Sequence, residues 1–416
     1  MEQVKVIMLF LVFWVGVVVY GIDSEATGSG DIDLNVEIEH KLKLLNKPAV
    51  KSIWSEDGDV FDCIDVHNQP AFDLPTLKNH KIQMKPSFKL PQESSNVKGG
   101  MPSLLASQTW RKNGSCPIGT VPIRRVRKQD LLRATSVGEF GKKYLPSNSP
   151  PREQVVVINN TQVKVPVMDN YSQAIILTMA YNYIGAEGDI NVWNPRVDLD
   201  SDFTTAQIWL SHGYEFVEAG WMVNPKLYGD RQTRLFVHWT VDANQGKGCF
   251  DLTCPGFVQT SHDVGVGSAI TPISSTSGDQ YEITVSINWD PQTTNWWVAV
   301  NNYAFGYFPG ELFNLLRHSA TIVRWGGEVY SPQVKGNTPH TGTAMGSGQY
   351  SDTLAGNACY INKIRETGWN MQKKYPEWVA VWSDEEYCYN GNNFREGIVG
   401  EPTFYFGGPG QGRYCP

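Results

Sequence analysis

Short segments in which apolar and polar residues alternate recur through the C-terminal two-thirds of the chain. In residues 282–289, Ile283, Val285, Ile287 and Trp289 fall on one face, and residues 234–241 repeat the pattern. Further short apolar segments, 296–300 and 377–382, begin after proline-containing turns. Because Gly, Pro, Asn and Asp separate these segments, the pattern favours a mainly β chain built around an antiparallel β-sandwich.

The length of 416 residues exceeds one typical domain, so we expect two. Residues 1–21 are a short charged start followed by an apolar run, which predicts a signal peptide, with a membrane anchor as the alternative. Residues 147–152 have the composition of an exposed linker. The prediction is therefore a signal peptide at 1–21, a smaller α+β domain at 22–150 and the β-sandwich at 151–416. Residues 31–53 are predicted to be helical, with Pro48 stopping the run.

Seven cysteines agree with secretion to the extracellular space. Cys249 and Cys254 are close enough for a local bridge, Cys388 with Cys415 would tie down the C-terminus, and Cys63 with Cys116 would close an N-terminal loop. Cys359 is then left over. A metal site is the competing use of these cysteines, but there is no CxxC and no histidine at ligand spacing, so no metal is predicted. Three sequons predict glycosylation at Asn113, Asn159 and Asn170.

Charge divides the chain. Residues 1–150 carry 19 Lys and Arg against 16 Asp and Glu, whereas residues 151–416 carry 16 against 26. The basic run around residues 111–133 lacks the interleaved aromatics of a nucleic-acid site. We therefore expect a basic N-terminal domain lying against an acidic C-terminal domain, with no nucleic acid and, once the signal is removed, no membrane as partners; we expect a monomer.

Two glutamates stand in unusual surroundings. Glu218 lies inside the apolar, aromatic run 216–225, and Glu328 lies in the similar run 323–330. Burying an ionised carboxylate costs free energy unless it is paired, so each needs a partner. We predict that the two meet in space as a catalytic pair; the alternative is that each forms a structural ion pair with an arginine such as Arg324 or Arg234.

The sequence lacks the motifs of other catalytic classes. There is no Gly-x-Ser-x-Gly elbow, no HExxH, no P-loop and no dinucleotide fingerprint. Two neighbouring carboxyl groups cannot both ionise easily, so one can act as a base and the other as an acid. Such a pair would hydrolyse a peptide bond or a glycosidic bond. A non-catalytic binding module of the cell wall or apoplast is the third possibility.

The chain resembles the neprosin family of plant secreted proteins over almost everything after the signal. The N-terminal resemblance rests on residues 57–63, 69–72, 77–80 and 116–125, and the C-terminal one on motifs that include Asn191–Pro195, Gln207–Leu210, Glu218–Trp221, Tyr228–Asp230, Asn295–Trp297, Trp325–Glu328 and Met345–Gly348. It implies an activation-peptide domain followed by a peptidase domain. It also implies the disulfides Cys63–Cys116, Cys249–Cys254 and Cys388–Cys415; Cys359 is an extra thiol.

The resemblance further implies a glutamic endopeptidase, synthesised as a zymogen, that cleaves mainly after proline in protein or peptide substrates at acid pH. Its catalytic residues match Glu218 and Glu328, and its own propeptide would act as an intramolecular inhibitor. No metal or organic cofactor is needed. Trp221, Trp325 and Tyr330 are expected to line the cleft and bind substrate, with core packing as the alternative for each.

Overall fold

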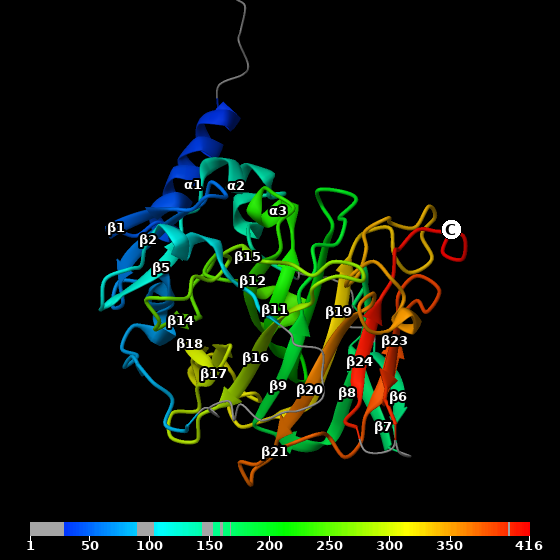
Figure 1. Cartoon of the computed structure of the whole chain (residues 1–416). Helices are drawn as coiled ribbons and strands as arrows, with labels where there is room; N and C mark the ends of the chain where they lie inside the picture. The colour runs from blue at the N-terminus through cyan, green and yellow to red at the C-terminus, as the bar shows by residue number, and fades with distance from the viewer. Residues whose placement is uncertain (1–28, 90–103, 144–152, 159–160, 167, 398–399) are drawn as a thin grey trace, which may run out of the picture.

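A computed structural model describes residues 29–89, 104–143, 153–158, 161–166, 168–397 and 400–416. The signal peptide, the linker and Asn159 lie outside these residues. The described chain is mostly β, with a small α+β module at the N-terminus and a large two-sheet body (Figure 1). The predicted fold class is confirmed.

The N-terminal module contains two helices and a three-stranded sheet. The sheet has the order β1–β2–β5, with β1 at Ala49–Trp54, β2 at Val60–Asp65 and β5 at Thr120–Arg124. The helices are α1, Ser29–Leu45, and α2, Lys128–Arg133. The predicted helix over 31–53 is thus correct only as far as Leu45. Pro48 ends the helical pattern, and the segment after it pairs with β2 as an antiparallel strand.

One sheet of the body carries both glutamates. Its order is β13–β12–β11–β10–β19–β8–β22, and all neighbouring pairs are antiparallel. The strands are β8, Tyr171–Tyr183; β10, Phe203–His212; β11, Glu215–Val223; β12, Arg234–Asp242; β13, Lys247–Phe250; β19, Ala320–Tyr330; and β22, Ala380–Ser383.

The second sheet covers one face of the first. Its main path is β14–β18–β17–β16–β9–β20–β24–β23, with β21 on β20 and β3 on β16. The strands are β3, Leu104–Leu105; β9, Gly185–Asn191; β14, Val258–Gln259; β16, Tyr281–Trp289; β17, Trp296–Val300; β18, Tyr303–Phe308; β20, Cys359–Thr367; β21, Lys373–Lys374; β23, Asn390–Phe394; and β24, Thr403–Gly407.

Short elements connect these layers. They are α3, Pro225–Tyr228; the strands β4, Ser107–Gln108, β6, Glu153–Ile158, β7, Thr161–Pro166, and β15, Ile270–Thr271; and the 3-10 turns Pro70–Asp73, Pro75–Leu77, Thr109–Asn113, Val137–Glu139, Ala243–Gln245, Gly310–Leu312 and Ser351–Thr353. No helix among the described residues is long and apolar enough to cross a membrane.

The main core lies between the two sheets. Alternate residues of the first sheet, among them Val217, Ala219 and Val323, point into it and are fully buried. Because side chains alternate along a strand, the residues between them, including Glu218, must lie on the opposite face. Part of that opposite face packs against apolar residues of the N-terminal module, among them Leu131 and Phe140.

The three predicted disulfides are present: Cys63–Cys116, Cys249–Cys254 and Cys388–Cys415. Cys359 is a buried free thiol.

The N-terminal module also pairs directly with strands of the body. Strand β3 runs parallel to the start of β16, and β4 pairs antiparallel with β15. The two parts of the chain therefore share sheets as well as side-chain contacts.

Candidate active site

Glu218 and Glu328 occupy the same face of the first sheet, on strands that flank the central strand β10. Glu218 on β11 pairs with Trp209, and Glu328 on β19 pairs with Thr205. Directly paired residues share a face, so both carboxylates project from the side away from the main core. Both are fully buried, with exposures of 0% and 1%. The two glutamates lie diagonally across β10 and converge above it.

A lysine from the N-terminal module holds the two carboxylates together. The Nζ atom of Lys143 lies 2.7 Å from Glu218 Oε2 and 2.6 Å from Glu328 Oε1. The two glutamate oxygens are therefore no farther apart than the sum of these distances. The Lys143 side chain is itself 0% exposed. The Tyr171 hydroxyl donates to the Lys143 carbonyl at 2.6 Å, and the Phe250 amide donates to the Gly141 carbonyl at 2.8 Å. Residues 141–143 are thus anchored to the body by main-chain and side-chain bonds.

Two amides and an imidazole complete the polar surroundings. Gln173 Nε2 donates to Glu328 Oε2 at 2.7 Å, and Gln207 Nε2 donates to Glu218 Oε2 at 3.1 Å. His238 Nδ1 lies 3.3 Å from Glu218 Oε1. His238 is on β12, directly paired with Glu218, so the sheet register fixes this contact. The two glutamates therefore have different neighbours: among the described residues, an imidazole lies beside Glu218 and none is recorded beside Glu328.

These neighbours separate the pKa values of the two carboxyl groups. Burial raises the pKa of Glu218, but Lys143 and then His238 outweigh it and bring that pKa to about 2. Burial also raises the pKa of Glu328; Lys143 lowers it, the Glu218 charge raises it again, and the net shift is upward. Burial lowers the pKa of Lys143, but the two glutamates reverse the effect and keep it charged. The arrangement favours one carboxylate, one carboxylic acid and one ammonium group.

An aromatic row borders the glutamates. Tyr330 pairs with Phe203 and with Tyr171 in the sheet register, two residues along from Glu328. The rings of Phe203 and Tyr330 stack with centroids 5.2 Å apart, and those of Tyr171 and Tyr330 lie 4.9 Å apart. A cavity of about 70 Å³ lies between this row and residues 139–143. Tyr330 therefore lies on the same face of β19 as Glu328, and its role in binding substrate stays a prediction.

Trp221 and Trp325 are not in this cleft. Both are 0% exposed and belong to the core between the sheets. Their indole N–H groups donate to Asn191 O at 2.9 Å and to Glu187 O at 3.1 Å, both on the second sheet. Each tryptophan lies three positions along the strand from its glutamate, and an odd offset turns the ring to the other face of the sheet. This corrects their expected role as substrate-binding residues and assigns them to core packing.

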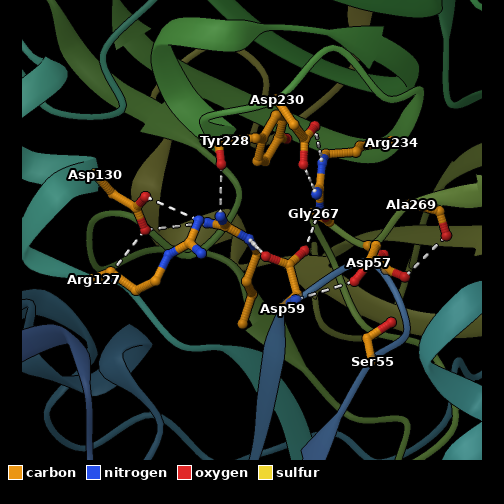
Figure 2. Close-up of polar contacts among 12 residues, drawn as sticks. Ser55, Asp57, Asp59, Arg127, Asp130, Tyr228, Asp230, Arg234, Gly267 and Ala269 are labelled. Carbon is orange, nitrogen blue, oxygen red and sulfur yellow. Dashed lines mark hydrogen bonds and ion pairs between the residues drawn. The ribbon is translucent and has the colours of Figure 1, made fainter.

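A second buried contact joins the N-terminal module to the body, away from the glutamates. Figure 2 shows Asp59, from the turn before β2, reaching Arg234 at the start of β12. Arg234 also pairs with Asp230 and donates to the Gly267 carbonyl at 2.7 Å. Arg234 is 0% exposed and Asp59 is 4% exposed, so the ion pair is shielded from water.

Arginines from the two parts meet around one tyrosine. Arg124 donates to Asp59 at 3.0 Å and to the Tyr228 carbonyl at 3.0 Å. The guanidinium groups of Arg124 and Arg234 lie 5.4 and 5.0 Å from the centre of the Tyr228 ring. The Tyr228 hydroxyl donates to Asp251, whose pKa burial raises to about 7.

The expected charge complementarity holds for several contacts. Basic side chains of the N-terminal module meet carboxylates of the body at Arg111–Asp263 and His80–Glu311, as well as at Lys143. Asp290 of the body accepts hydrogen bonds from the Ser87 amide and hydroxyl, at 2.7 and 2.6 Å. The Asp59–Arg234 pair has the opposite polarity, with the acid on the N-terminal module.

Among the predicted glycosylation sites, Asn113 and Asn170 are exposed. The side chain of Asn113 donates to the Trp54 carbonyl at 2.8 Å.

One group of potential metal ligands, His340, Cys388 and Cys415, occurs among the described residues. Cys388 and Cys415 are joined as a disulfide and offer no thiolate.

No role in the site was predicted from the sequence for Lys143, Gln173, Gln207 or His238. His238 lies in the predicted strand segment 234–241, so a pairing argument could have reached it. Gln207 begins one of the motifs that carry the family resemblance, but nothing in that motif assigns it a role. Lys143 had no such signal, since it is one basic residue among many in the N-terminal part.

Family comparisons extend these observations. The model of the neprosin family matches residues 200–409, and that of the neprosin activation peptide matches residues 52–165. The chain belongs to the neprosin family. Residues 52–165 include Lys143 and Asp59, so the module that covers the glutamates is an activation peptide. Family membership and this peptide together make the chain a peptidase zymogen.

Solved structures give weaker likenesses. Scytalido-glutamic peptidase with a peptide-based transition-state analogue aligns at 10% identity and a TM-score of 0.30, covering 58% of this chain and 98% of that one. SCP-B, a member of the eqolisin family in complex with the tripeptide Ala-Ile-His, aligns at 10% identity and a TM-score of 0.30, covering 57% and 97%. A Bacteroides ovatus GH16 protein aligns at 10% identity and a TM-score of 0.25, covering 55% and 85%. At these scores the likenesses carry no functional argument.

Proposed function

We propose that this neprosin-family chain is a secreted glutamic endopeptidase zymogen that cleaves after proline at acid pH, with Glu218 and Glu328 as its catalytic pair. The observation that carries the proposal is the buried Lys143 ammonium between the two carboxylates. Burying two carboxyl groups side by side costs stability, and the ammonium group that contacts both of them belongs to the activation peptide. Two carboxyl groups that become accessible when a covering segment leaves are suited to catalysis.

The two glutamates take different roles. His238 beside Glu218 stabilises the carboxylate form, and this contact remains after Lys143 has left. Glu328 keeps its proton because burial and the Glu218 charge both raise its pKa. Glu218 is therefore the general base and Glu328 the general acid.

The reaction then follows from these protonation states. Glu218 takes a proton from water while the water oxygen adds to the scissile carbonyl carbon, and Glu328 gives its proton to the carbonyl oxygen. The C–N bond breaks as the proton held by Glu218 passes to the departing nitrogen. One hydroxyl proton of the diol returns to Glu328 as the carboxylic acid forms, so both groups are restored.

Lys143 keeps the intact chain catalytically inactive. Its ammonium group takes the hydrogen-bonding positions of both catalytic carboxylates, and the buried contacts of residues 141–143 exclude water and substrate. Cutting the linker, near residues 146–151, would allow the activation peptide to leave. Lys143 is thus an intramolecular inhibitor rather than a structural counter-ion.

Substitution of each glutamate tests the proposal. The processed Glu218→Gln and Glu328→Gln variants should each lose at least about 1,000-fold in kcat on a proline-containing peptide at acid pH. Thermal unfolding of the unprocessed chains checks that the variants fold, and a peptide with alanine in place of proline reports the preference. Full activity in either variant would contradict the catalytic pair.

Secretion is tested separately, by whether deletion of residues 1–21 keeps the chain inside plant cells.

A further inference from the structure

Gln207 stands at the centre of the glutamate site. It lies on the middle strand β10, between the strand of Glu218 and the strand of Glu328. Its direct partners are glycines on both sides, Gly220 on β11 and Gly326 on β19. A Cβ at Gly220 would lie 2.8 Å from the Gln207 Cβ and 2.7 Å from its Cα. Glycine at that position therefore leaves room for the Gln207 side chain on the floor of the site.

The two ends of the Gln207 amide differ. Nε2 donates to Glu218 Oε2, the same oxygen that binds Lys143. Oε1 is buried and accepts no hydrogen bond from any of the described residues. The whole residue is 0% exposed. A buried carbonyl without a donor is unfavourable, so a donor is expected when the enzyme works.

We propose that Gln207 is a third functional residue of the site, orienting the attacking water in the processed enzyme. This rests on the proposed glutamate chemistry. Departure of the Lys143 side chain leaves space beside Glu218 Oε2, and a water that enters this space donates one hydrogen to Glu218 Oε2 and the other to Gln207 Oε1. With both hydrogens fixed, its lone pair is directed at the scissile carbonyl. The proton transferred goes to Glu218 alone; Gln207 exchanges none. Its Nε2–H also holds the Glu218 carboxylate in place.

Two substitutions separate this role from packing. Gln207→Met keeps an unbranched side chain of similar size but removes both amide groups, whereas Gln207→Glu keeps an acceptor oxygen and regains a donor when protonated. On the processed enzyme, we expect Gln207→Met to lower kcat about 10- to 100-fold at every pH, with KM changed less than about threefold. We expect Gln207→Glu to recover activity as the pH falls and the introduced carboxyl group gains a proton.

The outcomes are distinct. A Gln207→Met kcat within twofold of wild type would overturn the proposal. Equal loss in both variants at all pH values would also overturn it, because the residue would then serve only packing. Thermal unfolding of the unprocessed variants controls for folding. If Glu218→Gln and Glu328→Gln retain activity, the proposed function itself fails; if they are inactive while Gln207→Met is normal, only the role of Gln207 fails.

Discussion

Lys143 of the activation peptide and Glu218 of the β-sandwich form an ion pair in which neither side chain is exposed to solvent. Glu328 shares the same ammonium group. One cation thus balances a carboxylate and supports a second, protonated carboxyl group, which is how a site with two acids can stay buried in the zymogen.

Removal of this cation should weaken the hold of the activation peptide. In Lys143→Met, the two carboxyl groups lose their buried partner, so docking should weaken by about 3–5 kcal/mol. We expect faster processing of the chain and measurable peptidase activity before the linker is cut. The rate of processing at acid pH, followed by gel electrophoresis, measures the effect. Lys142→Met is the matched control, since the neighbouring Lys142 does not contact the glutamates; equal rates for the two variants would contradict the blocking role of Lys143.

Low pH should lower the stability of the uncut chain through protonation of Glu218. Its pKa in the folded, uncut chain is about 2, below the ordinary value of 4.5, so its contribution to the stability of the uncut chain is present above about pH 4.5 and is lost as the pH falls toward 2. This contribution is of the order of 3 kcal/mol. The pKa of Glu328 is raised, so its contribution to the stability of the uncut chain has the opposite pH dependence and is lost as the pH rises.

Thermal unfolding of the uncut chain between pH 6 and pH 2 measures this dependence. Other carboxylates will add to the slope, so the informative quantity is the difference between wild type and Lys143→Met. We expect the wild-type unfolding temperature to fall more steeply below pH 4.5. Parallel curves would show that the Lys143 pair does not supply the acid response.

The Asp59–Arg234 pair should act as a second attachment, independent of the glutamates. Asp59→Asn leaves the buried Arg234 charge with Asp230 alone, and we expect docking to weaken by about 3 kcal/mol and processing to accelerate. The control is Arg111→Gln, which removes a half-exposed pair with Asp263 and should cost less than about 1 kcal/mol. A larger effect at Arg111 than at Asp59 would contradict the assignment.

Gly220 should tolerate no side chain. A Cβ there would lie 2.1 Å from the Ala206 carbonyl oxygen, in addition to its close approach to Gln207. Gly220→Ala should therefore lower the free energy of unfolding by about 1–3 kcal/mol or more. Gly138→Ala, where a Cβ would meet no atom within 4 Å, should change it by less than about 0.5 kcal/mol. Chemical denaturation of both variants tests the contrast.

Local patterns were sufficient for much of the fold. The alternation in residues 282–289 and 234–241 predicted β16 and β12 within one residue at each end, and close sequence positions predicted the disulfide Cys249–Cys254. The same alternation places Trp221 on the face of β11 opposite Glu218, and this agrees with its burial in the core rather than with the predicted role in substrate binding. The helix after residue 29 was extended too far because the strand after Pro48 is stabilised by pairing with β2, which local sequence does not reveal.

The site could be predicted only in part. Two carboxylates in apolar strands signal a need for partners, which is a property of each residue and its neighbours. Lys143 meets that need from 75 residues away along the chain, and nothing local distinguishes it from Lys142. Its role depends on the docking of one module onto another.

The strands β3 and β4 of the activation peptide are paired with β16 and β15 of the body. The two parts therefore form these hydrogen bonds in a single folding reaction. Once the linker is cut and the activation peptide leaves, the strands that paired with β15 and β16 are no longer present. We expect the processed enzyme to survive through a slow rate of unfolding rather than through equilibrium with its unfolded chain. Denatured processed enzyme should then refold poorly, because the activation peptide that took part in the original folding reaction is absent.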